Sequence, residues 1–473
     1  MKARFLLAAA AFACAVFTAE AFDSFKDAFQ AARKARNEKN YDEALKICTE
    51  AKSLASKSWE KYTIADIEAS AYWGKNDLKS ALAKLDELID MEGTSADQKV
   101  FAMVKKANYL KWKSRRDEAE AVYKKAMEID VKGHPRQDLL NAYADLLRFQ
   151  KKFDDAMELY KQAAAIEKGH PAAQQVAKLG IATTSADMKD YDKAMQLYNE
   201  IIENPKAQNW IKASAYRGIA EKIYLPRKKY AECAEFMKKV EADENIPKNQ
   251  KGWIGTVGIR MNVDQIKALL KEKKYDEAME KAKETKNIQT QDSWSKYQRD
   301  AIASEVEIHR ANDLKNQKNF DEAIGVYKKV AEMEGTPEYR KQGAILGIAA
   351  CLIQQKKLDE AKEQIDKAMA FPKQEPNMKA SAANVLADYY LTKKQFDDAI
   401  AALENLPLSS KQLDPGWKAS VYTKLASICF YRKKDLAKAD EYIKKAKDVP
   451  NAKWGRNKKL EEQIKAALEK QNQ

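Results

Sequence analysis

A short phrase returns at a nearly constant interval along this chain of 473 residues, and it limits the possible folds more than any other feature. The phrase begins with Tyr, Phe or Leu, continues with Asp and a second charged residue, and closes on Ala. Clear copies close at Ala44, Ala156, Ala194, Ala278, Ala323, Ala361 and Ala399. Weaker copies close at Ala81, Ala119, Cys233 and Ala439, so the chain contains eleven in all.

The interval between copies predicts the architecture. Successive copies lie 37 to 40 residues apart, except for two steps of 45 residues from Cys233 to Ala278 and on to Ala323. A unit of this length cannot bury a core alone, so each copy must stack on its neighbours. With 45% hydrophobic and 33% charged residues but only 15 Gly and 11 Pro, the chain is rich in helix formers. These features predict an all-α fold, an α-α superhelix.

Each unit has the pattern of a helical hairpin. Another alanine stands twelve residues before the closing alanine in eight of the eleven units. Bulky or apolar residues follow the closing alanine at four and seven residues, which places them on one helical face. A polar joint such as Gln150-Lys-Lys152 ends one helix, and the Asp of the phrase starts the next as an N-cap or a first-turn acid.

These positions resemble the tetratricopeptide repeat family. Its small residues, its aromatic residue and its terminal proline are matched by Ala144, Ala156, Tyr160 and Pro171, and again by Ala311, Ala323, Tyr327 and Pro337. The resemblance covers residues 22–450 and implies a right-handed solenoid of about eleven hairpins. Residues 454–473 lack the phrase, but Leu460, Ile464, Ala467 and Leu468 recur at helical spacing, which predicts a capping helix.

The array departs from the family pattern around its two long steps. Ile266 and Thr285 stand where the family has small residues, and a polar stretch at 243–249 precedes glycines at 252, 255 and 258. We expect two continuous arrays, 22–245 and 246–453. The long steps are interpreted as longer hairpins, with a hinge or a binding insert as the alternative.

The first 21 residues have the pattern of a signal peptide. Lys2 and Arg4 precede an apolar run from Phe5 to Phe17, and small residues at Ala19 and Ala21 suit cleavage after Ala21. A membrane anchor or a lipoprotein signal at Cys14 is the alternative. The prediction is an exported bacterial protein, periplasmic or extracellular, with no membrane segment after cleavage.

The positive charge is spread along the chain. Lys2, Arg4 and Glu20 would leave with the signal, which changes the formal charge from +14 to +13. The lysines occur in every unit, as expected of solvated helix faces, although such an excess can also attract an anionic partner. Nucleic acid is not expected as a partner of an exported protein.

The cysteines and the polar residues give no indication of catalysis. Cys48, Cys233, Cys351 and Cys429 lie at least two units apart, so we expect small buried side chains rather than disulfides. The three histidines, His134, His170 and His309, form no metal-ligand motif, and the acidic pairs recur with the repeat. No enzyme activity, cofactor or metal is predicted.

Function is therefore expected on the surface of the first helices. In tetratricopeptide repeats, the residues one and four positions after the first small residue commonly face a bound peptide. By resemblance these are Asn108 and Lys111, Asp145 and Arg148, Asn312 and Lys315, and Asp388 and Leu391. An Asn and a Lys one turn later can hold a carboxylate, so the two Asn/Lys pairs are the strongest candidates.

Three functions remain open on the sequence alone. The first is a non-enzymatic exported scaffold that binds proteins or peptides on its concave face. The second is a carbohydrate- or cell-wall-binding or processing protein, which needs exposed tryptophans such as Trp253, Trp294 or Trp417 around a cleft. The third is adhesion to an anionic polymer through the net charge, which salt would weaken. The partner and the oligomeric state are not specified.

Overall fold

The computed structural model describes residues 22–372, 374–452 and 457–472. These residues form helices and connecting turns, with no strand among them, so the predicted all-α fold is confirmed. The predicted signal at 1–21, with Cys14, lies outside the described residues, as does Trp454 at the start of the predicted capping segment. The chain divides into two compact units between Lys251 and Gly252.

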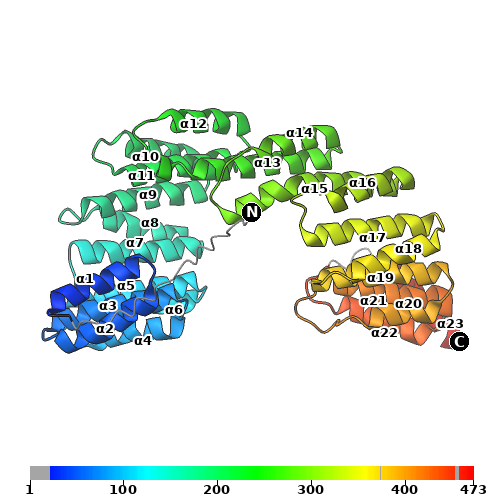
Figure 1. Cartoon of the computed structure of the whole chain (residues 1–473), viewed down its shortest axis with the longest axis horizontal. Coiled ribbons are helices and arrows are strands. Elements are labelled where there is room, and N and C mark those ends of the chain that lie inside the picture. Colours follow the sequence, from blue (N-terminus) through cyan, green and yellow to red (C-terminus); the bar gives the residue numbers. More distant parts are fainter. Residues whose placement is uncertain (1–21, 373, 453–456, 473) are drawn as a thin grey trace, which may run out of the picture. The chain divides into compact units, whose positions relative to one another are not determined.

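The first unit consists of six helical hairpins in succession (Figure 1). They are α1 (Phe25–Asn37) with α2 (Tyr41–Leu54), α3 (Ser58–Gly74) with α4 (Leu78–Asp90), α5 (Ala96–Trp112) with α6 (Arg116–Met127), α7 (His134–Phe149) with α8 (Phe153–Ala164), α9 (Pro171–Asp187) with α10 (Tyr191–Glu203), and α11 (Asn209–Gly218) with α12 (Tyr230–Ala242). The helix α11 continues into a π-helical turn, η1 (Ile219–Tyr224).

The second unit repeats the arrangement with five hairpins and a final helix. After the short η2 (Lys248–Gln250) of the first unit come α13 (Trp253–Lys271) with α14 (Tyr275–Lys286), α15 (Ser293–Asn316) with α16 (Phe320–Glu332), α17 (Glu338–Gln354) with α18 (Leu358–Met369), α19 (Pro376–Thr392) with α20 (Phe396–Glu404), and α21 (Pro415–Ile428), extended by the π-helical η3 (Cys429–Lys433), with α22 (Leu436–Lys447). The last helix is α23 (Lys458–Asn472).

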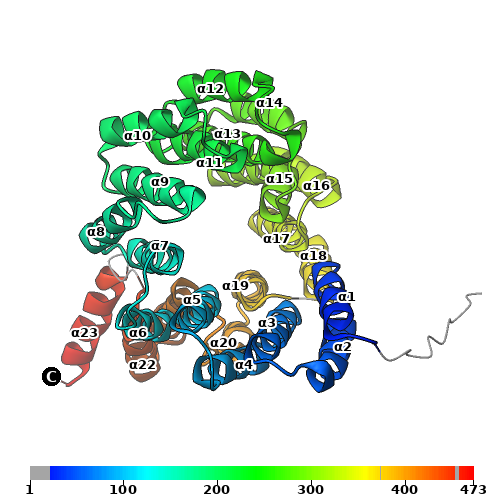
Figure 2. The ribbon, with the colours of Figure 1, turned by 90° about the vertical axis from the view of Figure 1, so that its left-hand side faces the viewer.

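First helices of successive hairpins contact one another within each unit. In the first unit α5 packs on α7 and α7 on α9, and in the second α15 packs on α17 and α17 on α19. Figure 2 shows α5, α7 and α9 side by side, with α6 and α8 on their outer side. The side chains of neighbouring first helices therefore form shared surfaces within a unit.

The closing residue of each phrase is buried in every hairpin. All eleven, ten Ala and Cys233, have no solvent-exposed surface, and each lies three residues into its second helix. The Asp of the phrase is the second residue of that helix, so it is a first-turn acid rather than an N-cap. The repeated phrase thus records the burial of one helix against another.

Every hairpin joint has the same backbone geometry. Five residues before each closing residue, one residue adopts a positive φ between 56° and 68°; nine of the eleven are lysines, and the other two are Asn76 and Ser114. At Lys151, for example, the Lys151 N–H donates to the Arg148 carbonyl and the next N–H donates to the Leu147 carbonyl. Such paired bonds end a helix and satisfy its last carbonyls.

Two π-helical turns explain hairpins in which the first alanine seemed to be missing. In η1 and η3 an extra residue enters the first helix, so the buried alanines are Ala220 and Ala426, thirteen residues before Cys233 and Ala439 rather than twelve. Both alanines are fully buried. The extra residue is accommodated in the helix, and the contact between the two helices is kept.

The hairpin α13–α14 also lacks the first-helix alanine, but here a change in the second helix compensates for the larger side chain. Ile266 occupies the position of the small first-helix residue and is fully buried, while Ala282 takes the place of the bulky residue in the second helix. The large residue thus lies on the first helix and the small residue on the second, the reverse of the usual arrangement. The glycines of α13 allow close packing, because a side chain at Gly255 would collide with the Gln289 carbonyl oxygen. The long steps are long first helices of 19 and 24 residues, together with their loops.

The remaining structural predictions concern the end of the chain and the cysteines. The helix α23 packs on α22 and buries Ile464 completely, as expected of a cap. Cys48, Cys233, Cys351 and Cys429 are buried free thiols, and the predicted burial is confirmed. In the described part of the chain, no helix combines the length and the apolar character needed to cross a membrane.

Candidate functional site

Each unit has one groove that contains predicted binding residues. The α5–α9 groove has a volume of about 700 Å³, and its lining includes Asn108, Lys111, Trp112, Asp138, Asp145 and Phe149. The α15–α21 groove has a volume of about 480 Å³, and its lining includes Asn312, Lys315, Tyr339, Arg340, Met378 and Trp417. Arg148 and Asp388 line neither groove.

The residue one position after the first-helix alanine has a structural partner. The buried hydroxyl of Tyr123 donates to Oδ1 of Asn108 at 2.9 Å, and Tyr327 donates to Oδ1 of Asn312 at 2.7 Å. Each tyrosine lies on the second helix of the same hairpin, fifteen residues further along the chain. The carbonyl oxygen of each Asn therefore already accepts one hydrogen bond, and the side-chain NH2 group remains able to donate to a ligand.

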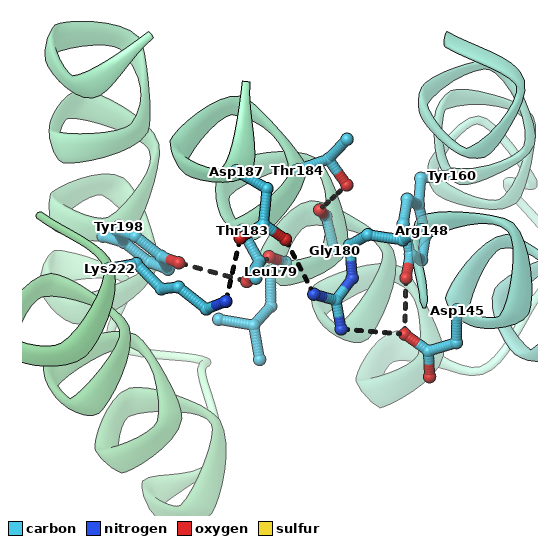
Figure 3. Close-up of polar contacts among 10 residues, drawn as sticks. All are labelled: Asp145, Arg148, Tyr160, Leu179, Gly180, Thr183, Thr184, Asp187, Tyr198 and Lys222. Carbon is cyan, nitrogen blue, oxygen red and sulfur yellow. Dashed lines mark hydrogen bonds and ion pairs between the residues drawn. The ribbon is translucent and has the colours of Figure 1, made fainter. Parts of the chain in front are cut away.

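Asp145 and Arg148 belong to a polar ladder across three hairpins (Figure 3). Tyr160 donates to Asp145 at 2.5 Å, and Arg148 pairs with Asp187 at 2.9 Å. Asp187 in turn accepts from Lys222 of η1 at 2.8 Å. The side chains of Arg148 and Asp187 are only 19% and 17% exposed. Arg148 thus holds α7 against α9 rather than pointing into a groove.

Asp388 is also engaged, but at the surface. Its carboxylate is half-exposed and pairs with Lys424 of α21 at 2.8 Å. Lys424 also donates to the Asn384 carbonyl at 2.8 Å, so it joins α19 to α21. Among the predicted binding residues that form ion pairs, Asp388 is the most exposed, and it lies outside both grooves. Leu391, predicted beside it, also lines neither groove and packs against the core.

Lys111 and Lys315 are the predicted residues most available to a ligand. Neither takes part in an ion pair among those formed by the described residues, although both line a groove. Burial lowers the pKa of Lys111, while the nearby Asp145 carboxylate opposes that shift. Each ammonium group retains hydrogen-bond donors for a ligand.

The two grooves differ in charge. The α5–α9 groove is lined by two basic residues, Lys111 and Arg116, and two acidic ones, Asp138 and Asp145. The α15–α21 groove is lined by Lys315 and Arg340, with no acidic residue among its described lining. Arg340 pairs with Glu305 at 2.7 Å, whereas Lys315 has no ion-pair partner among the described residues.

Exposed aromatic residues of the first groove were missed in the sequence. Trp112 and Phe149 are 62% and 61% exposed and end α5 and α7. The ring centroid of Trp112 lies 5.6 Å from that of Trp73, and Trp73 stacks on Tyr109 with 4.2 Å between their ring centroids. Both exposed rings stand seven residues before a closing alanine. This shared position is the feature of the sequence from which the pair of rings could have been predicted.

The tryptophans named in advance do not form such a group. Trp253 and Trp417 are partly buried, and Trp417 alone lines the α15–α21 groove. Trp294 is 64% exposed and stacks on Tyr297 at 5.3 Å. Several aromatic rings of the array, such as Trp210 and Trp294, are therefore exposed on first helices rather than buried in the core.

Two histidines meet across neighbouring hairpins. His134 begins α7 and His170 caps α9, and their ring centroids are 5.3 Å apart. Nε2 of His134 lies 3.4 Å from Asp138, whose pKa is raised by burial, an effect that the two histidines oppose. No group of three metal-ligating side chains occurs among the described residues.

Together the hairpins define a helical-repeat protein whose grooves are lined mainly by residues of its first helices. Residues 316–385 match a tetratricopeptide repeat family model, and this segment runs from the end of α15 through most of α19. The match supports a tetratricopeptide repeat protein and overlaps much of the α15–α21 groove.

Similarity to individual proteins is more limited. The Protein STIP1 homolog of Dictyostelium discoideum is 33% identical over 116 residues, which are 23% of this chain and 20% of that protein. The chain thus spans about a fifth of the length of this curated relative.

Two solved structures are also similar. The APC/C hetero-tetramer Cut9-Hcn1 has 13% identity and a TM-score of 0.32, over 94% of this chain and 97% of the other. A tetratricopeptide repeat protein from Parabacteroides merdae ATCC 43184 has 14% identity and a TM-score of 0.28, over 82% and 100%. Neither similarity bears on function.

Proposed function

We propose that this protein is a non-enzymatic scaffold whose α15–α21 groove binds an acidic segment of a partner protein. The observation that carries the proposal is the charge of this groove, in which Lys315 stands without a carboxylate partner among the described residues and no acidic residue contributes to the lining. A partner carboxylate would supply the missing charge.

The rest of the lining suits a peptide. Tyr339, Met378 and Trp417 provide apolar surface, and the amide group of Asn312 remains free to donate while its oxygen holds Tyr327. Aromatic and methionine side chains are common where proteins bind one another. The match of residues 316–385 to a tetratricopeptide repeat supports the same assignment.

The test uses two labelled peptides that differ only in charge, one alternating Glu and Leu and one with Gln in place of Glu. Fluorescence anisotropy should show tighter binding of the Glu peptide, and Lys315→Ala should weaken it about tenfold, or ~1.4 kcal/mol. Lys328→Ala is the matched control, because Lys328 is exposed on the second helix α16 and lies outside the groove. Equal binding of both peptides, or equal loss in both variants, would overturn the proposal.

Export is part of the same proposal and rests on Lys2, Arg4, the apolar run that follows, and Ala21. Expression of the full chain in a bacterium, followed by fractionation and N-terminal sequencing, tests it. Recovery of a periplasmic protein that begins at Phe22 is expected, whereas an uncleaved cytoplasmic chain would contradict export.

A further inference from the structure

The α5–α9 groove carries a frame of aromatic rings that the proposed peptide site does not use. Trp112 and Phe149 lie at its border and each exposes more than half of its surface. Trp112 is supported from behind by Trp73 and Tyr109, whose rings are nearly parallel, with an interplanar angle of 11°. Exposing large rings costs hydrophobic free energy, so two of them around one groove point to a ligand with an apolar face.

The polar groups between these rings both donate and accept hydrogen bonds. The Lys111 ammonium is a donor. The Asn108 side chain offers its NH2 group as a donor, since its oxygen already accepts a hydrogen bond from Tyr123. Asp138 and Asp145 are acceptors with side chains that are 35% and 49% exposed. Ser114 can do both.

The formal charges of this lining cancel. Lys111 and Arg116 oppose Asp138 and Asp145, so a strongly charged ligand of either sign would meet a like charge. A neutral ligand that presents hydroxyl groups at its edges and C–H groups on its faces meets no such repulsion. A volume of about 700 Å³ lies within the range of small-molecule sites.

From these observations we infer that the α5–α9 groove is a binding site for a neutral oligosaccharide. Trp112 and Phe149 stack on the faces of pyranose rings, and Asn108, Lys111 and Asp138 bind their hydroxyl groups. An acidic peptide of the kind proposed for the α15–α21 groove is the less suitable occupant, because Asp138 and Asp145 line this groove. The site is separate from the peptide groove, which lies in the other unit.

The test measures binding of neutral hexasaccharides of the chitin, cellulose and starch series to the full chain by calorimetry. At least one series should bind, and Trp112→Ala should weaken it tenfold or more, because one of the two exposed rings that stack on the sugar is lost. Trp294→Ala is the matched control, because Trp294 is 64% exposed in the second unit and lines neither groove. Circular dichroism checks that both variants keep their helices.

Two further variants sharpen the result. Trp112→Phe should keep part of the affinity, because a ring remains, and Asp138→Asn should lower it through the hydroxyl contacts alone. Absence of binding at millimolar concentration, or equal losses in the Trp112 and Trp294 variants, would overturn the inference. So would selective binding of a neutral peptide in place of every sugar. Lys315→Ala should leave sugar binding unchanged, so the failure of one site is distinguishable from failure of the other.

Discussion

A side chain at Gly347 would collide with the ring of Tyr327: a Cβ atom placed there lies 2.6 Å from Cζ of the tyrosine. Tyr327 is buried in α16, and Gly347 lies on α17, twenty residues later. Gly180 and Gly218 stand in the same relation to Tyr160 and Tyr198. The absence of a side chain in one hairpin makes room for the aromatic residue of the hairpin before it.

Gly347→Ala should therefore destabilise the protein by about 1–3 kcal/mol, because the added methyl group overpacks a rigid core. Urea unfolding measures the loss. Gly325→Ala is the control, since nothing lies within 4 Å of a Cβ at that position in α16, and alanine there should be neutral or stabilising by up to ~1 kcal/mol. Similar destabilisation by both changes would contradict the role assigned to the Tyr327 ring.

Asp187→Ala should cost about 3 kcal/mol, because it removes the closer of the two carboxylates paired with the largely buried guanidinium of Arg148 and leaves only Asp145, at 3.8 Å. The comparison is Asp276→Ala, which removes an ion pair with Arg310 but from a carboxylate that is 92% exposed. That change should cost less than ~1 kcal/mol. Chemical unfolding at low and high salt distinguishes the two, since only the exposed pair should respond strongly to salt.

Deleting Arg432 should be tolerated, because it shortens the interval from Ala426 to Ala439 from thirteen residues to the twelve found in most hairpins. The expected loss is below ~1 kcal/mol. Thr392 occupies the same position relative to Ala399, but α19 contains no π-helical turn. Thr392 is the last residue of α19, so its deletion should put the joint that follows out of register with the helix and cost more than ~3 kcal/mol. Thermal melts of the two deletions, if alike, would contradict this account of η3.

Glu120 should make the free energy of unfolding depend on pH in the acidic range. Burial raises its pKa, but hydrogen bonds from Lys124, Lys152 and Gln150 outweigh that effect and lower it to about 2. Because the folded pKa lies below the ordinary value of ~4.3, the stabilisation is complete above about pH 4.5 and is lost as the pH falls toward 2.

Glu120→Gln should accordingly lower stability by about 1 kcal/mol at pH 7, and the difference from the unmodified chain should shrink between about pH 4.5 and 2.5. Melting temperatures across that range provide the measurement. Glu235→Gln is the control, because Glu235 is 66% exposed in its pair with Lys238. A difference for Glu120 that stays constant with pH would contradict the assigned cause.

The hairpins were predictable because burial leaves a direct mark on the sequence. A position where two helices are in close contact, such as Ala156, accepts only small residues, so alanine recurs in ten of the eleven copies and cysteine stands in the other. The π-helical turns were not predictable, since an extra residue at 219–224 looks like a lost alanine rather than a shifted one. The repeat pattern predicts which residue is buried, but it does not predict that a π-helical turn accommodates an extra residue.

The binding residues were only partly predictable for a related reason. Asn108 and Asn312 were predicted as ligand contacts from their positions, yet each accepts a hydrogen bond from the tyrosine fifteen residues later. That pairing was visible in the sequence as a hydrogen-bonding residue opposite each of these tyrosines. Trp112 was missed because its exposure depends on the packing of Trp73 and Tyr109, which lie on two different helices.

The left-handed lysines at the joints have a consequence for the charge of the whole molecule. All nine are exposed, and together they supply nine positive charges against a formal surplus of +14. Asparagine adopts a positive φ more readily than lysine, and none of the nine lines either groove. Replacing them would remove most of the surplus and leave every residue that lines the two grooves in place, so the net charge of this protein can be changed independently of the residues proposed to bind ligands.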